Sequence, residues 1–261
     1  MRNCLLGLVV SWPMDFLNEA RRLSELRAEA MGIRDKAPSM VRAIEGRNSE
    51  GYLALIAEYK RASPSGIIRL DLDPWTYFNA VGRYAAGFSV LVEPIYFLGS
   101  PEFVKIALAY GKPILYKDFV TSRIQVDEAG RLGASAILII KRMLGDKAWE
   151  LADYARSIGI EPLIEVDNEE DALDVVKEYP EAMLGVNSRD LTSLEVSLDR
   201  AISIVRLVKG RVRVIVAESG VRTVEQAQRL ASEGANAVLV GTALMKNPQL
   251  AEGLSKVRLV K

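Results

Sequence analysis

The sequence contains no histidine, and Cys4 is the only cysteine among its 261 residues. Without histidine the chain cannot build a Ser-His-Asp or Cys-His site, and it offers no imidazole ligand to a metal ion. A lone cysteine forms neither an intramolecular disulfide nor a thiolate metal site, so we expect no metal and a cytoplasmic location. Acid–base chemistry must then come from lysine, glutamate, aspartate, tyrosine or Cys4.

An excess of charge of either sign is also absent, because 34 Lys and Arg residues balance 34 Asp and Glu residues. A nucleic-acid-binding protein should show a basic excess or stripe, so nucleic acid is not an expected partner. No apolar run reaches the ~20 residues of a membrane span, so a membrane is not expected either. The opening stretch "MRNCLLGLVVSWP" has only a short apolar run and no cleavage pattern, and we interpret it as a packing segment rather than a signal peptide.

From about residue 53, short apolar runs alternate with amphipathic stretches. The runs are rich in Val, Ile and Leu without strict polar alternation, which is typical of strands buried on both faces. They predict strands at 53–59, 88–93, 113–117, 136–141, 161–166, 182–187, 212–219 and 237–242. The stretches between them predict eight helices, two of which begin at Asp-Pro or Ser-Pro and several of which end at Gly.

Eight strand–helix units in about 210 residues predict a (β/α)8 barrel, an α/β fold of one domain covering residues 53–261. A doubly wound open sheet is the alternative, but its first strand should lead into a Gly-rich turn, and "RASPSG" is not that fingerprint. Residues 1–52 do not fit the repeat. We interpret them as an N-terminal helical extension packed on the barrel, with a charged helix at 14–32.

Charged side chains gather at the predicted strand ends, where barrels of this kind carry out their chemistry. They are Glu58, Lys60, Glu93, Lys117, Lys141, Glu165 and Glu218, with Asn187 and Arg189 after the sixth strand. One charge at a wet strand end is ordinary, and only the set is informative. Glu58 and Lys60 point to the same side of their strand, so they can converge with Lys117 and Glu165 in the barrel mouth. Lysines and glutamates held together there would shift one another's pKa values, as acid–base catalysis requires.

The last two strands end differently, in "ESG" and "VGTAL". Backbone N–H groups of Gly220, Gly241 and Thr242 could face an anion there, at the place where such barrels often bind a substrate phosphate. Plain turn glycines are the alternative interpretation. The paired position after strands seven and eight favours a phosphate site.

With these features, the chain resembles indole-3-glycerol phosphate synthases along about residues 53–247. "IAEYKRASPSG" (56–66) carries the most specific part of the resemblance, reinforced in family order by "YFLGS", "KDF", "EPLIEV", "GVNSRDL", "AESG" and "VGTALM". The resemblance implies that 1-(2-carboxyphenylamino)-1-deoxyribulose 5-phosphate closes to indole-3-glycerol phosphate, with loss of carbon dioxide and water. It implies no cofactor, and we expect a monomer.

The resemblance also implies residue roles. Lys117 would be the general acid for ring closure, and Glu165 an acid or base in dehydration. Lys60 would contact the substrate carboxylate or donate a proton, and Glu58 would orient the lysines. Asn187 and Glu218 would hold ribulose hydroxyls or orient their neighbours. The remaining implied contacts are Ser63 and Phe97 for the anthranilate side, Arg189 and Ser219 for substrate, and Gly220, Gly241 and Thr242 for phosphate.

The sequence departs from the family pattern in three places, and two alternative functions stay open. The N-terminal extension does not match the family clearly, Thr242 stands where serine is common, and Tyr116 precedes Lys117 where an apolar residue is usual. One rival is phosphoribosylanthranilate isomerase, which needs a cysteine base, whereas Cys4 lies outside the predicted barrel. The other is an inactive barrel that serves as a binding subunit, which the intact set of lysines and glutamates argues against.

Overall fold

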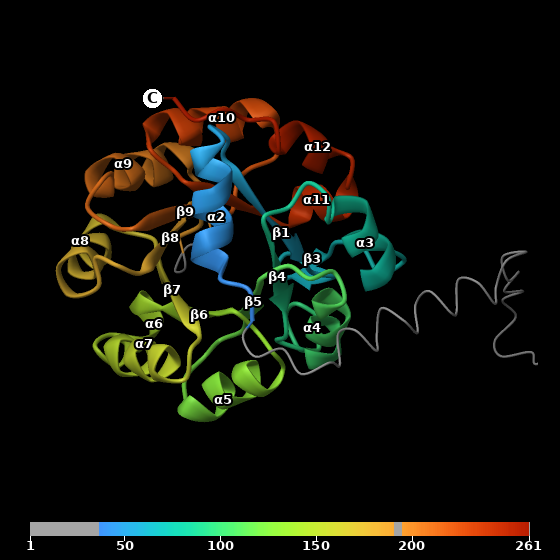
Figure 1. Ribbon diagram of the computed structural model, residues 1–261, viewed down its shortest axis with the longest axis horizontal. Helices are drawn as coiled ribbons and strands as arrows, with labels where there is room; N and C mark the ends of the chain where they lie inside the picture. Colours follow the sequence, from blue (N-terminus) through green and yellow to red (C-terminus); the bar gives the residue numbers. More distant parts are fainter. Residues whose placement is uncertain (1–36, 191–194, 261) are drawn as a thin grey trace, which may run out of the picture.

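Eight parallel strands close into a barrel in the computed structural model, which describes residues 37–190 and 195–260 (Figure 1). The strands are β1 (Ala54–Tyr59), β4 (Gly87–Leu91), β5 (Ile114–Lys117), β6 (Ala136–Ile140), β7 (Glu161–Val166), β8 (Met183–Asn187), β9 (Val214–Glu218) and β10 (Ala237–Val240). Each strand pairs with the next along the chain, and β10 pairs with β1. The predicted barrel is therefore confirmed, and the open-sheet alternative is wrong.

Helices follow each strand and form the outer ring. They are α3 (Pro74–Val81), α4 (Pro101–Leu108), α5 (Arg123–Arg131), α7 (Lys147–Ser157), α8 (Glu169–Glu178), α9 (Leu198–Val208), α10 (Val224–Glu233) and α12 (Leu250–Leu254). Short side chains set where they begin: the Asp73 carboxylate accepts the Thr76 N–H at the start of α3, and Ser100 does the same for Glu102 at α4. Proline at the first helical position of both helices is preorganised for that geometry.

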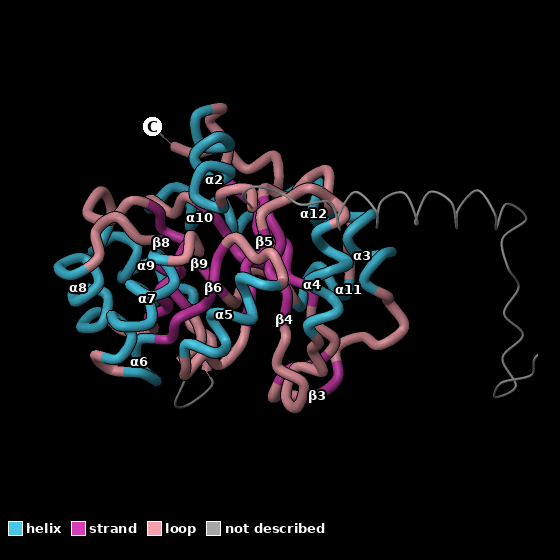
Figure 2. Tube along the Cα trace, turned by 60° about the horizontal axis from the view of Figure 1, so that its bottom comes forward, coloured by secondary structure: helices cyan, strands magenta, loops and turns pink. Residues whose placement is uncertain are grey.

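One more helix, α2 (Met40–Ser49), precedes the barrel and lies across its amino-terminal end. Its Met40, Val41 and Ile44 belong to the same buried cluster as the inward side chains of the strands, such as Leu163 and Leu239. In Figure 2 this helix lies at one end of the barrel, and the small hairpin of β2 (Ala62–Ser63) and β3 (Gly66–Ile67) lies at the other. The amino-terminal end is therefore plugged, and the mouth must be at the carboxyl end.

A carboxylate from the barrel fixes the start of α2. Glu161, at the first position of β7, accepts the N–H groups of Met40 and Val41 at 2.7 and 3.1 Å and the hydroxyl of Ser39. These N–H groups have no partner within the helix, and a negative charge also suits the helix dipole there. Glu161 thus supports a helix more than a hundred residues before it in the chain.

The predicted strand 136–141 was one residue too long. The structure ends β6 at Ile140, and Lys141 opens the short helix α6 (Lys141–Leu144). Its ammonium lies 3.5 Å from Asp146 and 3.6 Å from Asp174, and 4.9 Å from the centre of the Trp149 ring. Lys141 is therefore a strand-end charge that serves outer packing and does not enter the mouth. The helix predicted at 14–32 lies outside the described residues.

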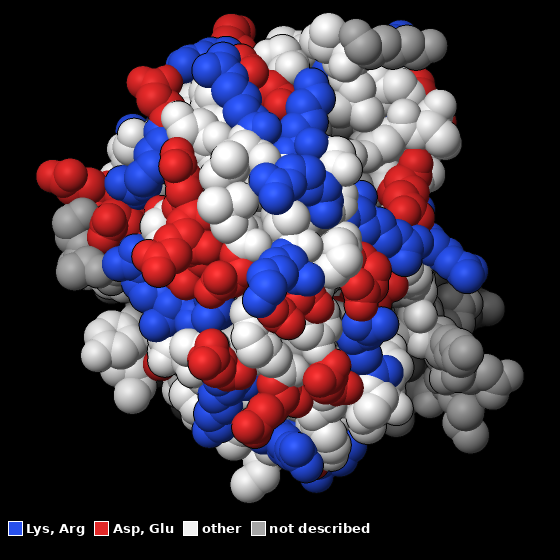
Figure 3. Space-filling view, turned by 90° about the vertical axis from the view of Figure 1, so that its left-hand side faces the viewer, with Lys and Arg blue, Asp and Glu red and all other residues white. Residues whose placement is uncertain are grey.

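The outer surface mixes charges of both signs. On the face that carries α7, α8 and α9, basic and acidic side chains are interspersed (Figure 3). Lys177 and Glu178 pair there at 2.8 Å, and Arg156 pairs with Glu181. Within the described residues, no helix is both long enough and apolar enough to cross a membrane.

Candidate active site

A cavity of about 910 Å³ opens at the carboxyl ends of the strands. Of the residues singled out from the sequence, those that line it are Glu58, Lys60, Ser63, Glu93, Phe97, Lys117, Glu165, Asn187, Arg189, Ser219, Gly220, Gly241 and Thr242. Lys141 does not line it, and neither does Glu218, which lies behind the cavity wall and is 1% exposed. Glu218 contacts Lys117 at 2.5 Å.

An ion-pair network forms the floor of the cavity. The Lys117 ammonium lies 2.5 Å from Glu218 and 3.3 Å from Glu58, and the Lys60 ammonium lies 2.8 Å from the other oxygen of Glu58. The Ser89 hydroxyl, fully buried on β4, donates to Glu58 at 3.3 Å. Glu58 therefore contacts both lysines, and Glu58 and Lys60 face the same side of β1, as their alternation along the strand predicts.

Burial and neighbouring charges separate the protonation states of these groups. Burial acts to raise the pKa of Glu58, but the ammonium groups of Lys60 and Lys117 outweigh it and lower that pKa to about 2. For Lys117, burial acts to lower the pKa, whereas Glu218, Glu58 and Glu165 raise it well above its usual range. Lys117 is thus a fixed cation that can give up its proton only to a base formed beside it.

Glu165 behaves in the opposite way to Glu58. Burial, followed by the nearby Glu218 carboxylate, raises the pKa of Glu165 to about 8, against the pull of Lys117. At neutral pH it holds a proton. The carboxylates of Glu58 and Glu218 then balance the two ammonium groups, so this buried set is nearly neutral, which lowers the cost of removing it from water.

Gly241 makes room for this network. β10 lies beside β1, and a Cβ atom at Gly241 would come within 2.3 Å of the Glu58 carboxylate and 2.9 Å of the Lys60 side chain. Real Cβ atoms do not approach other atoms so closely, so any side chain there would displace the ion pair. Gly241 therefore has a structural reason besides the predicted phosphate contact.

The loops after β9 and β10 form one side of the cavity. Ser219 and Gly220 both have left-handed backbones, with φ of 63° and 75°. Such a conformation is costly for serine, and strain of this kind often accompanies a functional loop. Thr242 is the first residue of α11 (Thr242–Lys246) and lines the same side of the cavity. A hydroxyl group and the backbone of two loops therefore face one region of the cavity.

The opposite side is aromatic. Phe97, in the loop after β4, and Phe119, in the loop after β5, have ring centres 6.1 Å apart and both line the cavity. Ser63 stands next to them on the β2–β3 hairpin, whose Ala62 N–H donates to the Phe97 carbonyl at 3.2 Å. A flat ring could lie against this wall.

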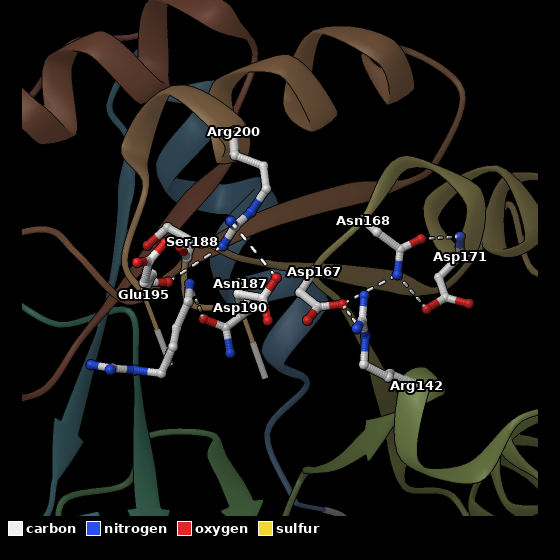
Figure 4. Close-up of polar contacts among 10 residues, drawn as sticks. Arg142, Asp167, Asn168, Asp171, Asn187, Ser188, Asp190, Glu195 and Arg200 are labelled. Atoms are coloured by element: carbon white, nitrogen blue, oxygen red, sulfur yellow. Dashed lines mark hydrogen bonds and ion pairs between the residues drawn. The ribbon is translucent and has the colours of Figure 1, made fainter. Parts of the chain in front are cut away.

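Polar side chains also line the rim between α6 and β8 (Figure 4). The Arg142 guanidinium donates to the buried carboxylate of Asp167 at 2.7 Å, and Asn168 donates to the same oxygen at 3.2 Å. Asn187 accepts the backbone N–H of Arg189 at 2.9 Å, which fixes the chain as it leaves β8. Arg142 was missed because it lies two residues beyond the strand end.

Apolar side chains at the strand ends also line the cavity. Leu138, Ile140 and Leu239 point inward and form part of the wall. The alternation of side chains along β6 places Leu138 and Ile140 on one side, a signal present in the sequence. Among the described residues, no group of three or more Cys, Asp or Glu side chains could hold a metal ion.

Comparison with known proteins identifies relatives along nearly the whole chain. The family described as indole-3-glycerol phosphate synthase matches residues 14–257. The indole-3-glycerol phosphate synthase of Pyrobaculum aerophilum is 45% identical over 248 residues, covering 94% of this chain and 97% of the relative. That of Methanopyrus kandleri is 38% identical, covering 90% and 93%.

Solved structures share the fold at much lower identity. A 3-hexulose-6-phosphate synthase superposes with a TM-score of 0.62 at 13% identity, covering 79% of this chain and all of that one. Tryptophan synthase from M. tuberculosis gives 0.61 at 14% identity, covering 85% and 100%. At this identity the likeness concerns the barrel alone.

Proposed function

Because this chain belongs to the indole-3-glycerol phosphate synthase family, we propose that the side chains of its barrel mouth divide the work of that reaction among themselves. The chain closes the indole ring of its phosphorylated substrate, with loss of carbon dioxide and water, in tryptophan biosynthesis. The assignment of roles to residues is our proposal. The observation that carries it is the network joining Lys117 to three buried carboxylates.

In ring closure, Lys117 donates its proton to the ketone oxygen while the ring carbon that bears the carboxylate attacks the carbonyl carbon. A charged ammonium suits this step because negative charge develops on that oxygen. The bond to the carboxylate then breaks, and its electron pair restores the aromatic ring as carbon dioxide leaves. Glu58 and Glu218 hold the ammonium from two sides, at 3.3 and 2.5 Å. We therefore assign Glu218 to positioning Lys117, because it does not line the cavity and so is poorly placed to bind ribulose hydroxyls.

In dehydration, Glu165 acts first as the acid. Its raised pKa supports this choice between acid and base, because the protonated form is present at neutral pH. The departing hydroxyl takes the proton and leaves as water. The Glu165 carboxylate formed in this way then accepts the proton that the adjacent carbon loses as the indole double bond forms. Asn187, which lies at the end of the neighbouring strand β8, orients the same part of the substrate.

The substrate spans the cavity. We propose that its phosphate binds between Ser219–Gly220 and Gly241–Thr242, where left-handed backbone and a hydroxyl face the cavity. Its aromatic ring lies against Phe97 and Phe119 beside Ser63, and its carboxylate meets Lys60 and Arg189. The two ends of the substrate are thus recognised by different chemistry, as positioning for ring closure requires.

The direct experiment is an assay of the purified chain with 1-(2-carboxyphenylamino)-1-deoxyribulose 5-phosphate. We expect a fluorescent indole product without added metal and in the presence of EDTA. Binding of the substrate by calorimetry without any product would instead favour an inactive binding barrel. Activity that appears only after a metal ion is added would contradict the roles given to Lys117 and Glu165.

We further propose that the protein works as a monomer in the cytoplasm. The single cysteine is in keeping with a reducing compartment. Sedimentation velocity tests the monomer: a single species near 28.8 kDa is expected, and a dimer would contradict it.

A further inference from the structure

Glu93 is a buried strand-end carboxylate that the proposed reaction does not use. It stands two residues beyond β4, is 7% exposed and forms no ion pair among the described residues. Its carboxylate instead accepts three backbone N–H groups: Ile95 at 2.8 Å on one oxygen, and Tyr96 and Phe97 at 2.7 and 3.1 Å on the other. Hydrogen bonds to an ionised acceptor are stronger than neutral ones, so this carboxylate holds the turn 94–97 tightly.

The backbone that follows the turn also holds it in place. The Gly99 N–H donates to the Glu93 carbonyl at 2.8 Å, and Leu98 has a left-handed backbone with φ of 52°. A Cβ at Gly99 would lie 2.5 Å from the Leu91 carbonyl, so the chain folds back against the end of β4. The turn therefore has little freedom to shift while Glu93 keeps its three bonds.

What this turn presents to the cavity is Phe97. The Tyr96 side chain before it is exposed, whereas the Phe97 ring faces Phe119 across 6.1 Å and lines the cavity. The Phe97 carbonyl also accepts the Ala62 N–H, so the hairpin that carries Ser63 leans on the same turn. A single carboxylate thus underlies the aromatic wall.

We propose that Glu93 is a positioning residue for the aromatic end of the substrate, acting through Phe97 by holding the turn 94–97. The inference rests on the proposed function, in which this wall receives the anthranilate ring. Glu93 lines the cavity beside this wall, but both of its carboxylate oxygens accept N–H groups of the turn, so it acts through Phe97 rather than by binding substrate. Its effect should accordingly fall on the aromatic end of the cavity and leave the phosphate end unchanged.

The test is Glu93→Gln, which keeps the size of the side chain but removes its charge and replaces one acceptor oxygen with a donor. The probes are anthranilate and inorganic phosphate, each measured alone as a ligand by calorimetry and as a competitive inhibitor. We expect anthranilate to bind about 10-fold more weakly and phosphate to bind as in the wild type. The KM for substrate should rise about as much, with a smaller fall in kcat.

Two comparisons separate positioning from a general loss of structure. Thr242→Ala should give the reverse pattern, with weaker phosphate and unchanged anthranilate. Adding Glu93→Gln to Phe97→Ala should change anthranilate binding little further, because both act on one contact. Glu102→Gln is the matched surface control, since its carboxylate pairs with Lys105 on the outside of α4 at 2.7 Å.

Several outcomes overturn the inference. Binding of both probes weakened to the same extent, or binding of neither probe weakened, would each contradict it. So would a double variant in which the losses of anthranilate affinity from Glu93→Gln and Phe97→Ala multiply. If Glu93→Gln does not fold, Glu93→Asp keeps the charge on a shorter side chain and should show the same selective pattern, smaller in size. A wild-type chain that binds both probes but forms no product would fail the proposed function while leaving the role of Glu93 open to the same binding test.

Discussion

The two ends of β7 carry the same side chain with opposite consequences. Glu161 opens the strand and Glu165 stands four residues later, so both point to the interior of the barrel. Glu161 meets the free N–H groups at the start of α2. Glu165 meets the Glu218 carboxylate, and burial beside it raises the pKa of Glu165 to about 8.

The difference teaches how one barrel separates stability from chemistry. At the amino-terminal end, a carboxylate is surrounded by donors and an apolar plug, which is a stabilising environment. At the carboxyl end, a carboxylate is held beside another carboxylate, an arrangement that costs stability and yields an acid useful at neutral pH. Barrels of this class generally keep reactivity at the second end.

The largest expected effect comes from the reactive end. Lys117→Ala removes the cation that Glu58 and Glu218 hold, so no acid remains to protonate the ketone. We expect kcat to fall on the order of 10²-fold or more, measured by product fluorescence at saturating substrate. Lys177→Ala, which removes an exposed lysine from α8, is the control and should keep full activity. Turnover near that of the wild type in Lys117→Ala would sink the role assigned to Lys117.

The contrast also marks what the sequence could predict. The apolar runs, together with the Gly and Ser-Pro residues at helix ends and starts, predicted the barrel. Hydrophobic periodicity and helix capping are signals that a short stretch of sequence contains by itself. Polar strand ends predicted the mouth, because parallel strands end at one edge. Lys141 shows the limit: it has the same local pattern as Lys117, yet the short helix α6 turns it outward to Asp146 and Asp174.

Long-range partners were beyond reach for the same reason. The sequence around Glu161 does not indicate that its carboxylate accepts hydrogen bonds from the N–H groups of Met40 and Val41, about 120 residues earlier. Glu93 looked like one more charged strand end, and only the backbone of the following turn gives it a purpose. The position of Glu218 behind Lys117, rather than in the cavity, likewise depends on packing across the barrel.

The next effect tests the plugged end. Glu161→Ala leaves the N–H groups of the buried Met40 and Val41 without their acceptor. We expect the free energy of unfolding to fall by roughly 2 kcal/mol, with kcat unchanged. Guanidinium denaturation and the product assay measure the two quantities. Glu181→Ala, at an exposed pair with Arg156, should cost much less. A loss in Glu161→Ala no larger than in this control would mean that α2 is held by its apolar face alone.

A third effect has the opposite sign and compares the two ends directly. Between pH 4.5 and about 8, folded protein holds a proton on Glu165 that the unfolded chain releases, so this group lowers the free energy of unfolding as pH rises. Glu165→Gln cannot lose a proton, and its amide can still donate to Glu218. The variant should therefore match the wild type near pH 4.5 and become more stable than it towards pH 8, by up to about 1.4 kcal/mol per pH unit within that window, while losing activity. Denaturation curves at several pH values measure the difference. If the difference in the free energy of unfolding does not change with pH, ionisation of Glu165 does not destabilise the folded protein. The two glutamates of β7 would then differ in their chemistry but not in their effect on stability.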